Sequence, residues 1–241
     1  MQRSLRALSL VFIAAGLAAC SDSSSPDTRF ACLGDPLPTT APNPINVIGQ
    51  IKGPALSPNA LSGVEILAST GTDTLAADTS NTPGFYALTI PTGGTPVNGF
   101  LKLTKSGYLP TSAYPSRPLA ADTVTNVLMI TSSDFGLLSG AVQVTQTAGN
   151  GFIGVVVKDC NGNPLAGATV SVSPVGSSSV RYNSGSTPSS SATSTSADGV
   201  AYVFNVTAGN ATVQASAGGH TLRQHIVNAR ADAITLTEIQ P

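Results

Sequence analysis

The chain has 241 residues, and only 10% of them are charged, against about 25% in an average soluble domain. Eleven lysines and arginines nearly balance twelve aspartates and glutamates, so the formal net charge is -1. No basic surface therefore favours nucleic acid as a partner. The length is enough for one large domain or two small ones.

The N-terminal residues have the layout of a secretory signal. Arg3 and Arg6 form a short positive region, and residues 8–17 are almost wholly apolar. This run of about ten residues is shorter than the roughly 20 that a helix needs to span a bilayer. We therefore expect a segment for export and not a permanent transmembrane anchor.

The residues that follow the apolar run, Leu17-Ala18-Ala19-Cys20, resemble the lipobox of bacterial lipoproteins. The resemblance implies a signal peptide of residues 1–19 and a lipidated Cys20 at the mature N-terminus, attached to a bacterial membrane. Ser21 is compatible, by the same resemblance, with the outer membrane. The alternative is an ordinary small-residue cleavage site with an incidental cysteine. One acyl chain anchors only weakly, but lipoproteins of this type carry more than one.

Residues 20–44 are expected to be a flexible tether followed by a linker. Residues 21–25 are mostly serine, which suits a flexible spacer. Residues 30–44 are rich in proline, which excludes a helix and disfavours a central strand.

Two cysteines remain once Cys20 is assigned to lipid, namely Cys32 and Cys160. An exported protein meets an oxidising environment, so a disulfide between them is predicted. In the chain-entropy model such a long loop contributes on the order of 4 to 5 kcal/mol. Two separate free thiols are the alternative.

The C-terminal half reads as a series of short strands bounded by turns. Residues 168–173 alternate between apolar and polar side chains, as in a strand with one buried and one exposed face. Asn161-Gly162 is a dipeptide suited to a tight turn. Such a series is typical of a β-sandwich. The expected strands are residues 152–157, 168–173, 200–206, 211–216, 222–229 and 234–239.

The N-terminal half repeats this pattern. Residues 61–66 parallel residues 165–170, and residues 84–88 parallel residues 199–203. We expect one fold used twice. The predicted units are residues 45–131 and 150–241, with residues 132–149 as a linker whose Ser133-Asp134 could cap one short helix.

Three stretches of the second unit, "GVVVKDCNGNPLAGATVSV", "SADGVAYVFNVTAG" and "NATVQA", resemble the carboxypeptidase regulatory-like module. The first unit, with "IGQIKG", "LSGVEIL" and "GFYALTIP", is similar to a looser version. The resemblance implies an all-β protein with two tandem Ig-like or transthyretin-like (prealbumin-like) β-sandwiches. The second unit departs from the family pattern at Thr207, where proline is usual, and at Ala211, where an aromatic is common.

No catalytic constellation is predicted, because the resemblance is to the accessory module of carboxypeptidases. A zinc peptidase needs a closely spaced His and Glu with a second His far downstream, whereas this chain has only His220 and His225. Two positions five residues apart on a strand point to opposite faces, so a metal pair is not expected. The serines lie mostly in runs without a GxSxG elbow.

Asp159, Asn161 and Asn163 place oxygens at alternate positions, like the start of a calcium loop. Gly162 then falls at position four instead of six, so we expect a turn. The sequence thus predicts no catalytic residues, no metal and no cofactor.

Recognition is expected in loops, namely 107–116 and the serine-rich stretch 176–191. The chain has no tryptophan, so Tyr108 and Tyr114 are the candidates for ligand contact; the alternative is that they pack across their own loop. The predicted function is a non-catalytic surface lipoprotein with a structural or adhesive role and a protein or glycan partner. A carbohydrate-binding module is the alternative, and an enzyme is a distant third.

Overall fold

The computed structural model describes residues 27–54 and 57–241, so Cys20 and the rest of the lipobox lie outside the described residues. Apolar side chains gather in two main cores, one within residues 45–129 and one formed by Phe30 with residues 153–239. The prediction of an all-β protein with two β-sandwiches is confirmed. Neither described helix has the length and apolar character to cross a membrane.

Sandwich 1 (residues 45–131) contains β1 (Ile45–Gly53), β2 (Asn59–Ala60), β3 (Glu65–Ser69), β4 (Thr74–Thr79), β5 (Phe85–Ile90), β6 (Phe100–Thr104), β7 (Thr111–Tyr114), β8 (Thr123–Val124) and β9 (Val127–Leu128). Sandwich 2 (residues 150–241) contains β10 (Gly151–Val157), β11 (Thr169–Ser173), β12 (Ser179–Ser184), β13 (Thr187–Ser189), β14 (Val200–Val206), β15 (Gly209–Ala217), β16 (His220–Thr221), β17 (His225–Ala229) and β18 (Ile234–Ile239). Two helices accompany them, the short 3-10 helix η1 (Thr28–Phe30) and α1 (Ser132–Ala141).

The two sandwiches share one pattern of strand pairing. In sandwich 1, β1 pairs antiparallel with β5 and parallel with β8 and β9. In sandwich 2, β10 pairs antiparallel with β14 and parallel with β18. The second sheets also match, since β3, β6 and β7 pair in the same order as β11, β15 and β17. By this correspondence, the β8–β9 segment is the equivalent of β18.

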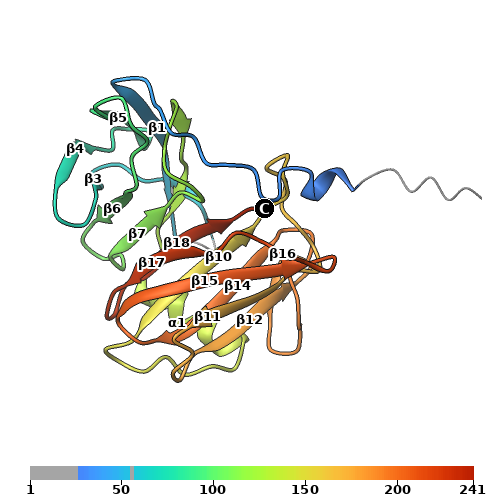
Figure 1. Ribbon diagram of the computed structural model, residues 1–241. Coiled ribbons are helices and arrows are strands. Elements are labelled where there is room, and N and C mark those ends of the chain that lie inside the picture. The colour runs from blue at the N-terminus through green and yellow to red at the C-terminus, as the bar shows by residue number, and fades with distance from the viewer. Residues whose placement is uncertain (1–26, 55–56) are drawn as a thin grey trace, which may run out of the picture.

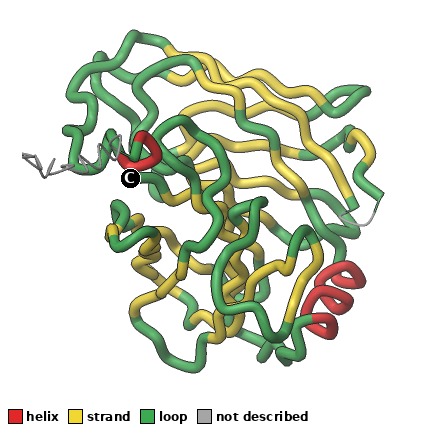
Figure 2. Tube along the Cα trace, turned by 90° about the vertical axis from the view of Figure 1, so that its right-hand side faces the viewer, coloured by secondary structure: helices red, strands yellow, loops and turns green. Residues whose placement is uncertain are grey.

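The sandwiches are fused and not simply strung along the chain. Strand β18 pairs parallel with β7, and this joins one sheet from each sandwich into a nine-stranded sheet (Figure 1). We call it the shared sheet; its order is β13-β12-β14-β10-β18-β7-β6-β3-β4. Figure 2, turned by 90° from this view, shows the strands between the short helix near the C-terminus, η1, and the longer helix α1 on the other side of the molecule.

Each sandwich uses a different face of the shared sheet. Paired residues of a sheet project to the same side, so Ile153 and Val155 mark the face that carries the core of sandwich 2. Leu101, Ala113 and Leu236 project from the opposite face, which carries the core of sandwich 1. We name these the sandwich-2 face and the sandwich-1 face. The two sandwiches therefore cover opposite faces of one sheet.

Helix α1 covers part of the sandwich-1 face beside β10 and β14. Its N-cap is Thr131, whose side chain forms a capping box with Asp134, so Asp134 of the predicted pair takes part in the cap and Ser133 lies within the helix. Phe135 lies edge-on against Phe152, with 5.1 Å between ring centroids, and stacks near buried Phe204. The linker is thus packed into a third apolar cluster.

Two segments expected to be loops contain strands. The stretch 107–116 includes β7, the strand through which the sandwiches join. The serine-rich stretch 176–191 forms the β12–β13 hairpin at one end of the shared sheet. Tyr182 is buried there and its hydroxyl accepts a hydrogen bond from the Val170 N–H at 2.9 Å. This stretch is ordered despite its polar composition, because β12 pairs with β13 and β14 and the side chain of Tyr182 is buried.

The described part of the expected flexible linker, residues 27–44, begins docked on sandwich 2. Phe30 is only 7% exposed, lies in the core of sandwich 2 and packs on His220 with 4.5 Å between ring centroids. The backbone N–H of Cys160 donates to the Arg29 carbonyl at 2.9 Å. A buried aromatic ring and the backbone hydrogen bond thus fix the start of the linker on sandwich 2.

Candidate functional site

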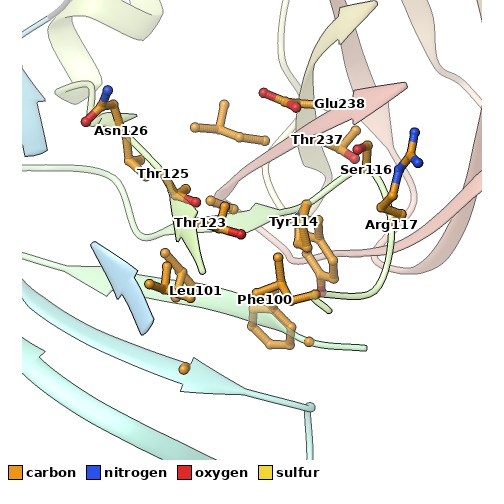
Figure 3. A pocket seen from close by; sticks show the side chains of 18 of the residues that line it. Phe100, Leu101, Tyr114, Ser116, Arg117, Thr123, Thr125, Asn126, Thr237 and Glu238 are labelled. Atoms are coloured by element: carbon orange, nitrogen blue, oxygen red, sulfur yellow. The ribbon is translucent and has the colours of Figure 1, made fainter. Parts of the chain in front are cut away.

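A groove of about 740 Å³ lies where sandwich 1 meets the shared sheet (Figure 3). One wall is the segment 123–128, which holds β8 and β9. The floor comes from β10 and β18 on the sandwich-1 face, and Ser116 and Arg117 lie at one end of the groove. The groove is thus formed by both sandwiches together.

Burial along β10 and β18 shows that this part of the sandwich-1 face is incompletely covered. The residues on the sandwich-2 face are buried, whereas alternate residues between 154 and 158, and between 236 and 240, are only half-buried. Val156 and Leu236 supply apolar surface, and Lys158 forms an ion pair with Glu238 beside them. The groove therefore has an apolar floor with a polar rim, which is common in binding sites.

The end of the groove carries an arginine held by an amide. The Arg117 guanidinium donates to the Gln240 side-chain oxygen at 2.9 Å, and the Ser116 hydroxyl donates to the same atom at 3.2 Å. Within residues 27–54 and 57–241 no carboxylate forms an ion pair with Arg117. Its positive charge is therefore available to a bound carboxylate.

The other face of the junction holds an aromatic cluster. The rings of Phe100 and Tyr114 stack with 4.7 Å between centroids, and the Arg230 guanidinium lies 4.8 Å from the Phe100 centroid. His225 meets Tyr114 edge-on at 6.1 Å, and the Asn228 N–H donates to the Tyr114 hydroxyl at 3.3 Å. Burial raises the pKa of Tyr114. This cluster fastens the sandwiches to each other.

The two tyrosines proposed as ligand contacts are not brought together. Tyr108 packs against the core of sandwich 1, while Tyr114 packs against the core of sandwich 2 on the opposite face of the shared sheet. Tyr114 contributes to the groove lining, but its ring is engaged by Phe100. A paired aromatic platform is therefore absent from this loop, in line with the alternative of packed tyrosines.

Cys32 and Cys160 form a disulfide, with 5.6 Å between their Cα atoms. This separation lies within the usual range of about 4.4–6.8 Å. The bond ties the segment before sandwich 1 to sandwich 2, across 128 positions of sequence. Sandwich 1 is therefore enclosed in a covalently closed loop.

The residues considered as metal ligands have other roles. His220 packs on Phe30, and His225 is hydrogen-bonded through Nδ1 to the Thr237 hydroxyl at 2.7 Å. In the ranges that the structure describes, no three His, Cys, Asp or Glu side chains gather as metal ligands.

Asp159 organises a turn. Its carboxylate accepts hydrogen bonds from the backbone N–H groups of Asn161 and Asn163 at 2.9 and 2.8 Å. Burial would raise the pKa of Asp159, but these hydrogen bonds outweigh it and hold the pKa below its usual range. The spacing that resembles a calcium loop is explained by this turn.

His225 makes stability depend on pH. Burial lowers its pKa below the ordinary 6.5, so the folded chain favours the neutral ring. The unfolded chain then binds a proton first as the pH falls, and stability is lost below about pH 6.5 down to the lowered folded value. We expect the denaturation midpoint to drop between pH 7.5 and pH 5, and His225→Gln to flatten this slope. An equal slope in the variant would contradict the assignment.

Searches with known proteins found no matching family model and no matching curated protein. Among solved structures, the Bacillus anthracis TIE protein is 12% identical over 80% of this chain, with a TM-score of 0.28. The chain spans 33% of the length of that protein. A shaft pilin, SpaA from Lactobacillus rhamnosus GG, is 15% identical over 84% of this chain and 98% of its own, with a TM-score of 0.26.

A third similar structure is a family CBM26 carbohydrate-binding module from Eubacterium rectale Amy13K in complex with maltoheptaose. It is 11% identical over 81% of this chain and 93% of its own, with a TM-score of 0.27. Scores at this level do not identify a common arrangement of the two sandwiches. The function is therefore inferred from the chain's own residues.

The sequence did not point to the groove. Its floor comes from strands whose other face is in the core of sandwich 2, and its walls meet only through the β7–β18 pairing. The one available signal was the change from apolar to polar residues at alternate positions, from Gly154 to Lys158 and from Leu236 to Gln240.

Proposed function

We propose that this chain is a non-catalytic, lipid-anchored surface protein with a structural or adhesive role, in which the two sandwiches act as one rigid unit. The observation that carries the proposal is the fusion of the sandwiches by the shared sheet, with the Cys32–Cys160 bond closing the loop around sandwich 1. A partner that binds one sandwich is then held at a fixed position relative to the other sandwich.

The arrangement of polar groups supports a binding role over turnover. The charged groups along the groove are Lys158, Glu238 and Arg117, and the first two neutralise each other. The two histidines are occupied by Phe30 and Thr237 and lie outside the groove lining. General acid–base chemistry needs a titrating group within reach of a substrate, and the carboxylate of the lining, Glu238, is held in an ion pair with Lys158.

Lipid attachment is tested with Cys20→Ala. We expect the wild-type mature chain to begin at Cys20 with an acyl modification seen by intact-mass analysis. The variant should lose membrane association, because the lipobox supplies its only acylated residue. A mature wild-type chain with an unmodified Cys20, or one that begins elsewhere, would contradict the anchor.

The adhesive role is tested on the same cells. We expect cells that display the wild type to be retained on host-cell layers or a glycan array, and cells that express Cys20→Ala to lose this retention. Retention on the array alone would favour the carbohydrate-binding alternative. Reproducible hydrolysis of peptide, ester or glycoside substrates by purified wild type would overturn the non-catalytic assignment.

A further inference from the structure

The sheet of sandwich 1 that contains β1 ends at an open edge. Within the described ranges, β8 and β9 pair with β1 on one side and with no strand on the other. Thr125 and Met129 donate their backbone N–H groups to β1, so those of the neighbouring residues Val124 and Leu128 point away from it. The segment 123–128, which carries these groups, lines the groove.

The chain itself shows what can occupy such an edge. Strand β18 is the equivalent of β8–β9 in sandwich 2, and its outer edge is covered by β7, a strand from the neighbouring sandwich. The equivalent position beside β8–β9 is the groove. Sandwich 1 is therefore one strand short of the arrangement that sandwich 2 has.

The floor below this position suits the side chains of an added strand. Val156 and Leu236 are half-buried and face the groove from the sandwich-1 face. Successive side chains of a strand point to opposite sides, so every second side chain of an added strand would cover this apolar floor. The remaining side chains would point to solvent.

We propose that the groove binds an extended segment of a partner protein, which pairs with the β8–β9 edge as an added strand. Apolar side chains at alternate positions lie over Val156 and Leu236, and an acidic residue at one end meets Arg117. Backbone pairing of this kind supplies affinity, and the side chains at alternate positions supply specificity.

A second copy of this chain is a poorer occupant. The strand of sandwich 2 that corresponds to β7 is β17, and the backbone of its residue Asn228 is already engaged. The Asn228 N–H donates to the Tyr114 hydroxyl at 3.3 Å, and the Asn228 carbonyl accepts from the Thr235 hydroxyl at 3.4 Å. Repeating the internal junction between copies through β17 would break these two hydrogen bonds.

The proposal deepens the adhesive role by naming the chemistry of the partner, and its test in purified protein needs no lipid anchor. Loss of anchoring and loss of strand binding can therefore be told apart.

The probe is a fluorescein-labelled synthetic peptide of about eight residues that alternates valine and threonine and ends in aspartate. A second peptide has the reverse order, because either strand direction can pair. Proline-substituted twins, which cannot donate backbone hydrogen bonds, are the controls.

We expect saturable binding of one peptide in fluorescence anisotropy, and at least tenfold weaker binding of its proline twin. Amide hydrogen exchange at Val124 and Leu128 should slow when the peptide binds. Val124→Pro, which removes one outward N–H, and Val156→Asp, which puts a charge in the floor, should each weaken binding at least tenfold. Phe85→Ser, at a residue 50% exposed and outside the groove lining, should change binding less than twofold.

An unchanged thermal unfolding midpoint shows that each variant is folded. If Val156→Asp does not fold, Val124→Pro alone is enough to test peptide binding. Three results would overturn the proposal. These are no binding of either peptide at millimolar concentration, binding without slower exchange at Val124 and Leu128, and binding of a malto-oligosaccharide to the groove when neither peptide binds.

Discussion

Replacing both bridged cysteines, in Cys32→Ser/Cys160→Ser, is expected to lower the free energy of unfolding by up to about 4 to 5 kcal/mol. The bond spans 128 positions, so its removal frees a long loop in the unfolded chain. Urea denaturation of the oxidised wild type and the double variant measures the difference. The double variant is preferred to a single one because it leaves no lone thiol.

Phe30→Ala with the bond intact separates the disulfide from the docking of the N-terminal segment. Phe30 is buried against sandwich 2, so its truncation should lower the free energy of unfolding by about 3 to 5 kcal/mol by cavity formation while the covalent loop remains closed.

For the double cysteine variant, a free energy of unfolding within about 1 kcal/mol of the wild-type value would show that the bond contributes little.

The second large effect is expected from Leu103→Ala in the core of sandwich 1. Leu103 is fully buried, and truncation of a buried leucine costs about 2 to 5 kcal/mol. Because β7 and β18 belong to one sheet, the loss should spread to sandwich 2. We expect a single unfolding transition, shifted to lower denaturant, and faster amide exchange in β10 as well as in β6.

The matched control is Val175→Ala in sandwich 2, at a residue that is 66% exposed. A substitution of this kind at the surface should change stability by less than about 0.5 kcal/mol. Faster exchange in β6 with unchanged exchange in β10 would mean that the sandwiches unfold separately, which would contradict the rigid unit proposed above.

Strands with a clear period of two could be predicted from the sequence. The apolar positions of residues 168–173 alternate with polar ones and are buried as expected. A local pattern decides here which face is buried, so no distant contact is needed. The turn at Asp159 could be predicted for the same reason. The strand expected at residues 200–206 also has the bounds of β14, although its mostly apolar residues do not alternate.

Features that depend on distant partners could not be predicted. Residues 111–114, Thr-Ser-Ala-Tyr, have no strong strand signal, and they form a strand because β6 and β18 pair on both sides. The serine-rich hairpin hid Val180 and Tyr182, two apolar residues at alternate positions that pack on the core of sandwich 2. The groove depends on the pairing of β7 with β18, so composition and periodicity along one strand do not reveal it.

The bond between Cys32 and Cys160 also bears on how the protein withstands proteases. A single cut between these two cysteines opens the backbone of the N-terminal segment, of sandwich 1, of the linker or of β10, yet both fragments stay joined through the bond and through the strands that pair across the cut. The exposed turns of sandwich 1 can therefore be nicked without loss of the piece that bears sandwich 2. Release of a fragment would need a second cut within that loop, or reduction of the bond followed by separation of the strands that pair across the cut.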